Sequence, residues 1–300
     1  MRILLTGATG QVGSALGPKL AHLGEVIAPG RADFDLALPE SLPSGLDRIR
    51  PDLIVNCAAY TAVDLAEDEV DVAFTVNAKA PATMSAWAAA RAAPMLHIST
   101  DYVFDGSGTR AWSEVDPTRP LSVYGRSKLE GENAVRNSGA PHLVVRTSWV
   151  YAATGKNFLR TIVGLALARP ELRIVADQMG APTSAETIAG LLTELIERHR
   201  ADLPAGFGRA DGLCHLTAQG TTSWHGFASA VVDGLRCRGL APACRMIAAI
   251  GTVEYPTRAV RPRNSRLSLE RLGAVYGLVP PHWHAGLEAE LDKYVTATLT

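Results

Sequence analysis

The chain has 300 residues, 47% of them hydrophobic, and a formal net charge of −1, so it can bury a core in one or two domains. This balance gives no basic excess for a nucleic-acid backbone or an anionic membrane surface. Even the alanine-rich stretch 84–98 is interrupted by Arg91 and Pro94, and the four cysteines form no C-x-x-C motif. We therefore expect a cytoplasmic protein with reduced thiols that binds neither nucleic acid nor membrane.

Short apolar runs alternate with helical patterns in the first half of the chain. Strands are expected at 2–6, 25–28, 53–57, 95–99 and 143–146, and helices at 11–23, 70–92 and 121–137. The strands are apolar without alternation, which is typical of a parallel sheet covered on both faces. The pattern predicts an α/β protein with a doubly wound parallel sheet of the Rossmann type.

The pattern changes after Thr147. Helices are expected at 157–168, 184–200, 223–237 and 281–298, separated by short strands and loops rich in proline and glycine. We predict a dinucleotide-binding domain over 1–150 and a smaller α/β substrate lobe over 151–300, packed on the carboxyl edge of the sheet. The strand at 212–216 fits either part, so this boundary is soft.

Three glycines follow the first predicted strand with the spacing G-x-x-G-x-x-G. Gly7, Gly10 and Gly13 allow a tight turn, a close approach of a pyrophosphate to the backbone, and close packing of helix on strand. Glycines also end strands in many α/β folds, so the motif alone is a weak indication of a nucleotide site. Gln11 and Val12 lie inside the same turn.

A second cofactor signal follows the second predicted strand. Arg31 stands where an acidic residue would bind the ribose hydroxyl of NAD, and an arginine there favours a 2′-phosphate. A solvated loop arginine is the alternative interpretation, and the cofactor is expected to be NADPH or NADH. Further residues follow strands at the same edge of the sheet and are predicted to line the adenine, pyrophosphate and nicotinamide ribose: Asp35, Leu36, Ala58, Ala59 and Tyr60.

Tyr124 and Lys128 are four residues apart on a predicted helix, so their side chains project from one face. Seven tyrosines and five lysines would produce such a pair by chance only about 0.1 times in this chain. A neighbouring ammonium favours the phenolate and is expected to lower the pKa of the tyrosine. Thr100 follows the fourth strand, where its hydroxyl can donate to a developing alkoxide. A solvent-facing helical pair and an ordinary strand-end hydroxyl are the alternatives.

Seven motifs in this order closely resemble the dTDP-4-dehydrorhamnose reductases, a family of extended short-chain dehydrogenases/reductases. They span nearly the full length: TGATGQVG, NCAAYTAVDLAE, STDYVFDG, YGRSKLEGE, RTSWVY, DQMGAPT and RPRNSRL. The resemblance implies NAD(P)H-dependent reduction of the C4 ketone of dTDP-4-dehydro-6-deoxy-L-mannose to dTDP-L-rhamnose, for cell-surface polysaccharide. It assigns proton donation to Tyr124, ribose binding and tuning of Tyr124 to Lys128, and polarisation of the ketone to Thr100.

The same resemblance implies the binding residues. Thr100, Asp101 and Trp149 match contacts to the sugar nucleotide. Contacts to the cofactor are matched by Gly10, Gln11, Val12, Asp35, Leu36, Ala58, Ala59 and Tyr60.

One position departs from the metal-linked assembly of the family. Some family members form a magnesium-linked dimer through glutamates, and Glu186 matches one such position whereas Ala15 stands at another. We therefore expect no metal, and a monomer or a weak homodimer. His282 and His284 form half a metal site without a third ligand nearby, and surface histidines are the preferred interpretation.

Two other classes of function stay open. One is another sugar-nucleotide enzyme, either an epimerase or a 4-ketoreductase of opposite stereochemistry. The other is a non-catalytic subunit similar to the regulatory partner of methionine adenosyltransferase, against which the intact Thr100, Tyr124 and Lys128 argue. Cofactor use separates them, because a reductase consumes its nicotinamide, an epimerase recycles it and a regulatory subunit does neither.

Overall fold

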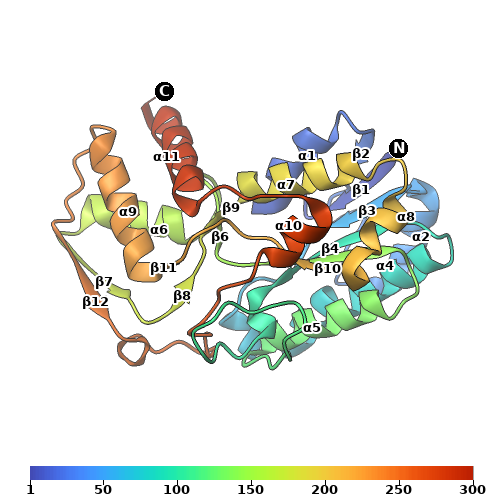
Figure 1. The fold of residues 1–300 in the computed structure, drawn as a ribbon, viewed down its shortest axis with the longest axis horizontal. Helices are drawn as coiled ribbons and strands as arrows, with labels where there is room; N and C mark the ends of the chain where they lie inside the picture. The colour runs from blue at the N-terminus through green and yellow to red at the C-terminus, as the bar shows by residue number, and fades with distance from the viewer. Residues whose placement is uncertain (300) are drawn as a thin grey trace.

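A computed structural model describes residues 1–299 and contains a central sheet of six parallel strands (Figure 1). The strand order is β10-β5-β4-β3-β1-β2. These strands are β1 Arg2–Thr6, β2 Glu25–Ile27, β3 Leu53–Asn56, β4 Met95–Thr100, β5 His142–Thr147 and β10 Leu213–His215. The predicted α/β class with a doubly wound parallel sheet is confirmed.

Both faces of the sheet are apolar because successive strand residues point to opposite sides. Ile3 and Leu5 face one core, and Leu4 between them faces the other. The first core is closed by helices α1 Gln11–Leu20, α7 Ala185–Arg198, α8 Leu203–Phe207 and α10 Glu270–Tyr276. The second is closed by α2 Leu42–Ile49, α4 Ala80–Ala89 and α5 Val123–Arg136. Figure 1 shows α1 and α7 above the sheet and α4 and α5 below it.

Strand β1 lies between β2 and β3, so the chain adds β2 on one side of β1 and the later strands on the other side. In open α/β sheets, ligands bind beyond the carboxyl ends of the strands at such a switch point. The segments that leave β1 and β3 carry the glycine turn and residues 57–60. The fold therefore places two of the predicted cofactor segments side by side.

The helix predicted over 70–92 is interrupted by a wider turn. It consists of α3 Val70–Phe74, a π-helical segment Thr75–Lys79 and α4. The π-helical segment directs Asn77 toward the 57–60 segment. The Asn77 side chain accepts a hydrogen bond from the Tyr60 N–H and donates one to the Tyr60 carbonyl oxygen. π-Turns of this kind frequently accompany functional sites.

A second group of elements follows β5 and has its own apolar core. Its helices are α6 Phe158–Ala168, α9 Trp224–Cys237 and α11 Trp283–Leu299. Its strands form the pairs β7 Glu171–Val175 with β12 Met246–Ile250, β6 Val150–Tyr151 with β9 Thr183–Ser184, and β8 Met179–Gly180 with β11 Thr222–Ser223. In Figure 1 this group lies beside the sheet.

The strand expected at 212–216, which fitted either part of the chain, is β10. It pairs with β5 and so extends the central sheet. Helix α7 also packs on α1, although it lies after residue 150. The division into domains 1–150 and 151–300 stays a prediction.

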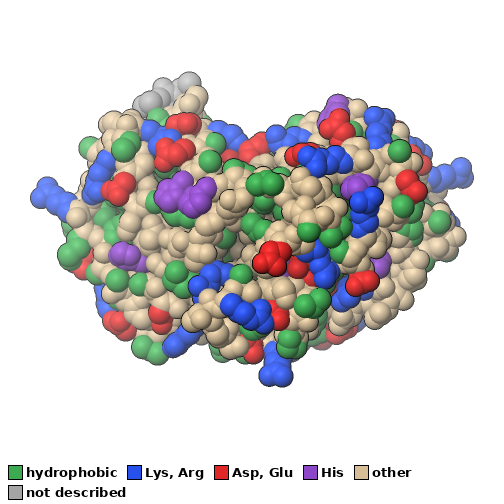
Figure 2. All heavy atoms as spheres, viewed as in Figure 1, with side chains coloured by type: hydrophobic (Ala, Val, Ile, Leu, Met, Phe, Trp, Pro, Cys, Tyr) green, Lys and Arg blue, Asp and Glu red, His purple; other side chains and the backbone are tan. Residues whose placement is uncertain are grey.

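Short 3₁₀ turns connect several of these elements. They cover Pro39–Ser41, Leu65–Glu67, Asp101–Val103, Arg209–Gly212 and Thr252–Glu254. On the face drawn in Figure 2, basic and acidic side chains are interspersed, and no extended region carries a single sign. Within residues 1–299, none of the helices combines the length and apolar character needed to cross a membrane.

Candidate active site

The glycine turn is built by close backbone contacts between β1, α1 and β3. Gly7 has φ +70°, and a Cβ there would lie 2.6 Å from the backbone nitrogen of Ala58. A Cβ on Gly13 would lie 2.1 Å from the carbonyl oxygen of Gly7. Any side chain at either position therefore displaces backbone rather than a flexible neighbour.

The first turn of α1 has the properties of an anion site. Gly10 is the N-cap, it is exposed, and it offers no side-chain bond to the free N–H groups of the turn. The first turn contains no acidic residue. Gln11 places a buried side-chain oxygen without a hydrogen-bond partner at the same turn, whereas Val12 packs on the apolar core. These residues fit a dinucleotide pyrophosphate, because helix N-termini favour negative charge.

The residues after β2 differ in what they can offer to a cofactor. Arg31 is exposed, and no hydrogen bond or ion pair within residues 1–299 engages its side chain. Asp35 accepts a hydrogen bond from the backbone of Ala37 at 2.9 Å, which shapes its own turn. Leu36 is buried among core side chains, so only its backbone remains available to an adenine.

The 57–60 segment is held by two buried asparagines that the sequence did not indicate. Asn56 accepts a hydrogen bond from the Ala58 backbone at 3.2 Å. Asn77 accepts one from the Tyr60 backbone at 2.8 Å and donates to the Tyr60 carbonyl at 3.0 Å. The backbone opposite the glycine turn is therefore fixed by a local bond to Asn56 and by longer-range bonds to Asn77.

Tyr124 lies in the first turn of α5, close to the end of β4. Ser122 caps the helix by accepting a bond from the Gly125 backbone at 3.1 Å. A Cβ on Gly125 would lie 2.3 Å from the carbonyl oxygen of Tyr102, so the glycine lets the helix start against that residue. The Tyr102 ring meets the Tyr124 ring edge-on at 5.4 Å.

Thr100 is the last residue of β4 rather than the first residue after it. Its hydroxyl donates to Asp101 at 3.1 Å and accepts from the Tyr102 backbone at 3.2 Å. Hydrogen bonding with the same hydroxyl lowers the pKa of the Tyr124 phenol. Burial raises the pKa of Asp101 to about 6, against the lowering effect of hydrogen bonds from Ser265 and Thr100. The structure thus brings Thr100, Asp101 and Tyr124 together.

The pKa of Tyr124 moves in the opposite direction to the sequence-based prediction. Burial raises it most, Asp101 and Tyr102 add to the increase, and the bond with Thr100 opposes it. The ammonium of Lys128 is instead directed at the carbonyl oxygen of Ile98, 2.7 Å away. Burial is the physical reason, because desolvation penalises the charged phenolate. The phenol consequently keeps its proton at neutral pH.

Trp149 is held in an unusual conformation beside these residues. Its backbone has φ +48°, a left-handed value that costs a non-glycine residue energy. Its ring stacks on Trp224 at 3.5 Å, and a Cβ on Gly180 would lie 2.6 Å from that ring. Trp224 in turn donates to Gln178 at 3.1 Å. The stacking of Trp224 on Trp149 joins residues 75 positions apart in the chain.

The RPRNSRL segment returns to the same region from the end of the chain. Arg261 forms an ion pair of 2.7 Å with Asp64, and the backbone of Ala259 donates to the same carboxylate. Arg261 lowers the pKa of Tyr102, and Ser265 lowers that of Asp101, although burial outweighs both effects. These contacts were missed from sequence, where the motif itself was the available signal.

The side chains that the sequence analysis weighed as metal ligands lie apart in the described part of the chain. Glu186 lies between two cations, 3.4 Å from Lys19 and 3.8 Å from Lys293. His282 and His284 approach to 3.1 Å through their Nδ1 atoms. Within residues 1–299, no group of three histidine, cysteine or carboxylate side chains is arranged to hold a metal ion.

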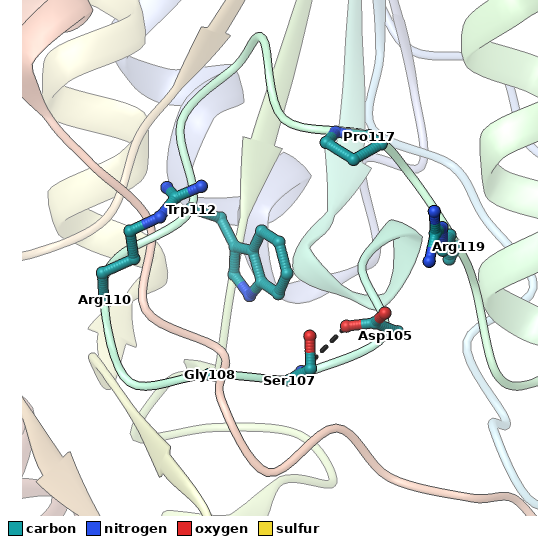
Figure 3. A pocket seen from close by; sticks show the side chains of 7 residues that line it. All are labelled: Asp105, Ser107, Gly108, Arg110, Trp112, Pro117 and Arg119. Atoms are coloured by element: carbon teal, nitrogen blue, oxygen red, sulfur yellow. Dashed lines mark hydrogen bonds between the residues drawn. The ribbon is translucent and has the colours of Figure 1, made fainter.

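A separate cavity of about 300 Å³ lies in the loop that follows this site (Figure 3). Arg110 lines it but is committed to Asp116 through two bonds of 2.7 and 2.6 Å. Trp112 stacks on buried Phe104 at 4.8 Å. Thr100, Tyr124 and Lys128 are not among its lining residues, so the cavity belongs to the scaffold of the loop.

Parallel strand order, a glycine turn at the switch point, and a Tyr-x-x-x-Lys helix beside the end of β4 define a Rossmann-type short-chain dehydrogenase/reductase. Residues 1–296 match the family model described as RmlD substrate binding domain, and the chain belongs to this family. A relative from Shigella flexneri named dTDP-4-dehydrorhamnose reductase is 44% identical over 99% of both chains.

Solved structures of similar proteins agree. The dTDP-4-dehydrorhamnose reductase from Clostridium acetobutylicum has a TM-score of 0.88 and 34% identity, covering 98% of this chain and 99% of that chain. The enzyme of the same name from Bacillus anthracis, solved with NADP, has a TM-score of 0.85 and 30% identity, covering 97% and 99%. The predicted family resemblance is confirmed over the full length.

Proposed function

We propose that this protein reduces the C4 ketone of dTDP-4-dehydro-6-deoxy-L-mannose to dTDP-L-rhamnose with NADPH or NADH. The observation that carries the proposal is the full-length membership of the reductase family, in a chain that gathers Thr100, Asp101 and Tyr124 at the end of β4. The structure of the Bacillus anthracis relative in complex with NADP supports NADPH as the cofactor.

The cofactor supplies the hydride, and the protein supplies its binding site. Free N–H groups at the start of α1 bind the pyrophosphate, and the fixed backbone of 57–60 borders it. Arg31 is free to meet a 2′-phosphate. Lys128 is assigned to the nicotinamide ribose, with its ammonium steadied by the Ile98 carbonyl.

Tyr124 donates the proton that completes the reduction. Its raised pKa keeps the phenol protonated, which is the form that a donor requires. Thr100 connects this hydroxyl to Asp101, so a ketone oxygen seated between Thr100 and Tyr124 meets two O–H groups. Asp101 accepts a hydrogen bond from the Thr100 hydroxyl in the structure, and protonation of Asp101 near pH 6 frees that hydroxyl to donate to the substrate.

The remaining contacts place the sugar nucleotide. The ring of Trp149, backed by Trp224, offers a flat apolar surface beside the reacting residues. Asp101 is buried and keeps one carboxylate oxygen without a partner within the described chain, so it can accept a sugar hydroxyl.

We also propose that the protein is cytoplasmic and acts as a monomer or weak homodimer without magnesium. The two lysines beside Glu186 and the alanine at position 15 support the part of this proposal that concerns magnesium. We propose in addition that the chain divides into a cofactor domain and a substrate lobe. Strand β10 belongs to the sheet of the cofactor domain.

A coupled assay tests the function. The purified protein is mixed with the dTDP-4-dehydro-6-deoxy sugar, its 3,5-epimerase and either NADPH or NADH, and the absorbance of the reduced nicotinamide is followed. We expect stoichiometric cofactor consumption and a product identified as dTDP-L-rhamnose by chromatography. Conversion without net consumption would identify an epimerase, and the absence of both would favour a regulatory subunit.

A further inference from the structure

His97 is a fully buried histidine on β4 that the proposed chemistry leaves unused. Its Nδ1 lies 2.9 Å from the side-chain nitrogen of Asn56, and its Nε2 lies 3.5 Å from the Nζ of Lys128. His97, on a strand of the central sheet, is therefore in contact with the Lys128 side chain.

The hydrogen bonds of Asn56 fix the tautomer of this imidazole. Asn56 uses its carbonyl oxygen to accept from the Thr6 hydroxyl at 2.6 Å and from the Ala58 backbone at 3.2 Å. Its nitrogen must then be the atom that faces His97, and it donates to Nδ1. Burial and the nearby Lys128 charge hold the pKa of His97 well below its usual range, so the ring is neutral with its single proton on Nε2.

The Nε2–H group of His97 is consequently aimed at Lys128. An ammonium has three donors and no acceptor, whereas a neutral amine has a lone pair that accepts this N–H. The contact therefore opposes the charged form of Lys128. The Ile98 carbonyl, 2.7 Å from Nζ, accepts a bond from either form and is strongest for the ammonium.

Glu132 lies on α5 one turn beyond Lys128. Its carboxylate is fully buried and held in place by Ser99 at 2.5 Å and by Arg146 at 2.7 Å. Three elements meet at this carboxylate, namely α5, β4 and β5. A fixed negative charge one helical turn away favours an ammonium.

The other titratable groups around Lys128 are Cys57, after β3, and Tyr124 on its own helix. Burial makes both keep their protons, so both are neutral near pH 7. Burial also lowers the pKa of Lys128 to about 8, and Glu132 opposes that decrease. The protonation state of Lys128 therefore depends on the balance between burial, which favours the neutral amine, and Glu132, which favours the ammonium.

We propose that His97 and Glu132 are positioning residues that act on Lys128 in opposite senses, His97 favouring its neutral amine and Glu132 its ammonium. The inference rests on the proposed function only in assigning Lys128 to the cofactor ribose. The alkaline limit of cofactor binding is then set by two residues that touch neither cofactor nor substrate.

The test is a direct titration of Lys128 by NMR on protein carrying ¹³C-labelled lysine. The chain has five lysines, and Lys128→Met identifies the signal. His97→Asn keeps an acceptor for Asn56, because the asparagine oxygen takes the place of Nδ1, but removes the N–H aimed at Lys128. We expect the midpoint of Lys128 to rise in His97→Asn and to fall in Glu132→Gln, each by about tenfold in the proton dissociation constant.

Ser99→Ala is the matched control, because it removes one bond to Glu132 and keeps the charge, so the Lys128 midpoint should stay where it is. The pH dependence of NADPH affinity should move in parallel with each midpoint. An unchanged midpoint in His97→Asn, or shifts of the same sign in both variants, would overturn the proposal. Should Glu132→Gln fail to fold with Arg146 left unpaired, the His97→Asn arm decides alone. The titration needs no substrate, so a failure of the proposed function appears separately, as absent ketone reduction by the wild type.

Discussion

Asp101 links catalysis to pH through a single buried carboxyl group. It is 2% exposed, it accepts a hydrogen bond from the Thr100 hydroxyl, and its negative charge raises the pKa of Tyr124. An ionised Asp101 thus keeps the phenol protonated but holds the Thr100 hydroxyl away from a substrate. The Thr100 hydroxyl is therefore freed as the pH falls through the Asp101 pKa of about 6.

The unfolding free energy of the protein should depend on pH through the Asp101 carboxyl group. The pKa of Asp101 is about 6 in the folded chain against an ordinary 3.8, so folding favours the protonated form. Its contribution to stability is complete below about pH 4 and is lost as the pH rises through 6. Asp101→Asn, which cannot ionise, should therefore gain up to about 3 kcal/mol in unfolding free energy relative to wild type between pH 4 and pH 7. Urea unfolding at both pH values measures this, and an equal difference at both would contradict it.

Tyr124→Phe tests the proton donor. The ring still packs against Tyr102, and only the hydroxyl is lost. General acid catalysis contributes about 10² to 10⁴ in rate, so kcat should fall by that amount while the Kd for NADPH stays nearly constant. Steady-state kinetics and cofactor fluorescence measure the two quantities. A decrease in kcat of less than about tenfold would rule out this assignment.

Arg31 tests cofactor preference. Its side chain is exposed, so a charge-assisted contact with a 2′-phosphate belongs at the weak end of the usual range, about 1.5 kcal/mol, or roughly tenfold in Kd. Arg31→Ala should weaken NADPH binding by this factor and leave NADH binding unchanged. Titrations of both cofactors at one salt concentration decide the matter, and equal effects on both would show that Arg31 is an ordinary loop residue.

At the scale of elements, the close seating of α5 on its neighbours positions the reacting residues. A Cβ on Gly131 would lie 2.0 Å from the carbonyl oxygen of Asn77 in the π-helical segment. The helix can approach that segment only because position 131 has no side chain. The same approach allows Asn77 to bond both Ser127 on α5 and the backbone of Tyr60.

Gly131→Ala should therefore force α5 away from the π-helical segment. Overpacking of this kind costs about 1 to 3 kcal/mol, and we expect kcat to fall as Tyr124 moves. Gly164→Ala is the matched control, because Gly164 is an exposed position of α6 with nothing within 4 Å of the added Cβ. That change should stabilise the protein by about 0.5 to 1 kcal/mol. Midpoints of chemical unfolding compare the two variants, and equal effects would refute the close contact.

At the scale of the whole molecule, the prediction concerns metal and assembly. Magnesium requires several oxygen ligands in near-octahedral geometry and gives up its water reluctantly. Glu186 is flanked by Lys19 and Lys293, whose positive charges compete with a cation for its carboxylate. EDTA should accordingly change neither the reductase activity nor the mass found by sedimentation. Dissociation of a dimer on chelation would contradict the prediction.

The sequence by itself determined the features that depend on neighbours along the chain. The period of apolar residues located the five strands of the first half within one or two residues, since burial on both faces makes such runs continuously apolar. The glycine spacing and the Tyr124 to Lys128 spacing are equally local, because a turn and one helical turn fix them. The helix over 70–92 was the exception, since the π-turn depends on Asn77 reaching Tyr60.

Only the tertiary structure decided the electrostatics and the aromatic contacts of the site. The pKa of Tyr124 rises rather than falls because the fold buries it, and the partners of Lys128 are His97 and Ile98 on another element. Trp149 meets Trp224, which lies 75 residues away in the chain. Burial and contacts between distant residues follow from how the elements pack, and local pattern carries no information on them.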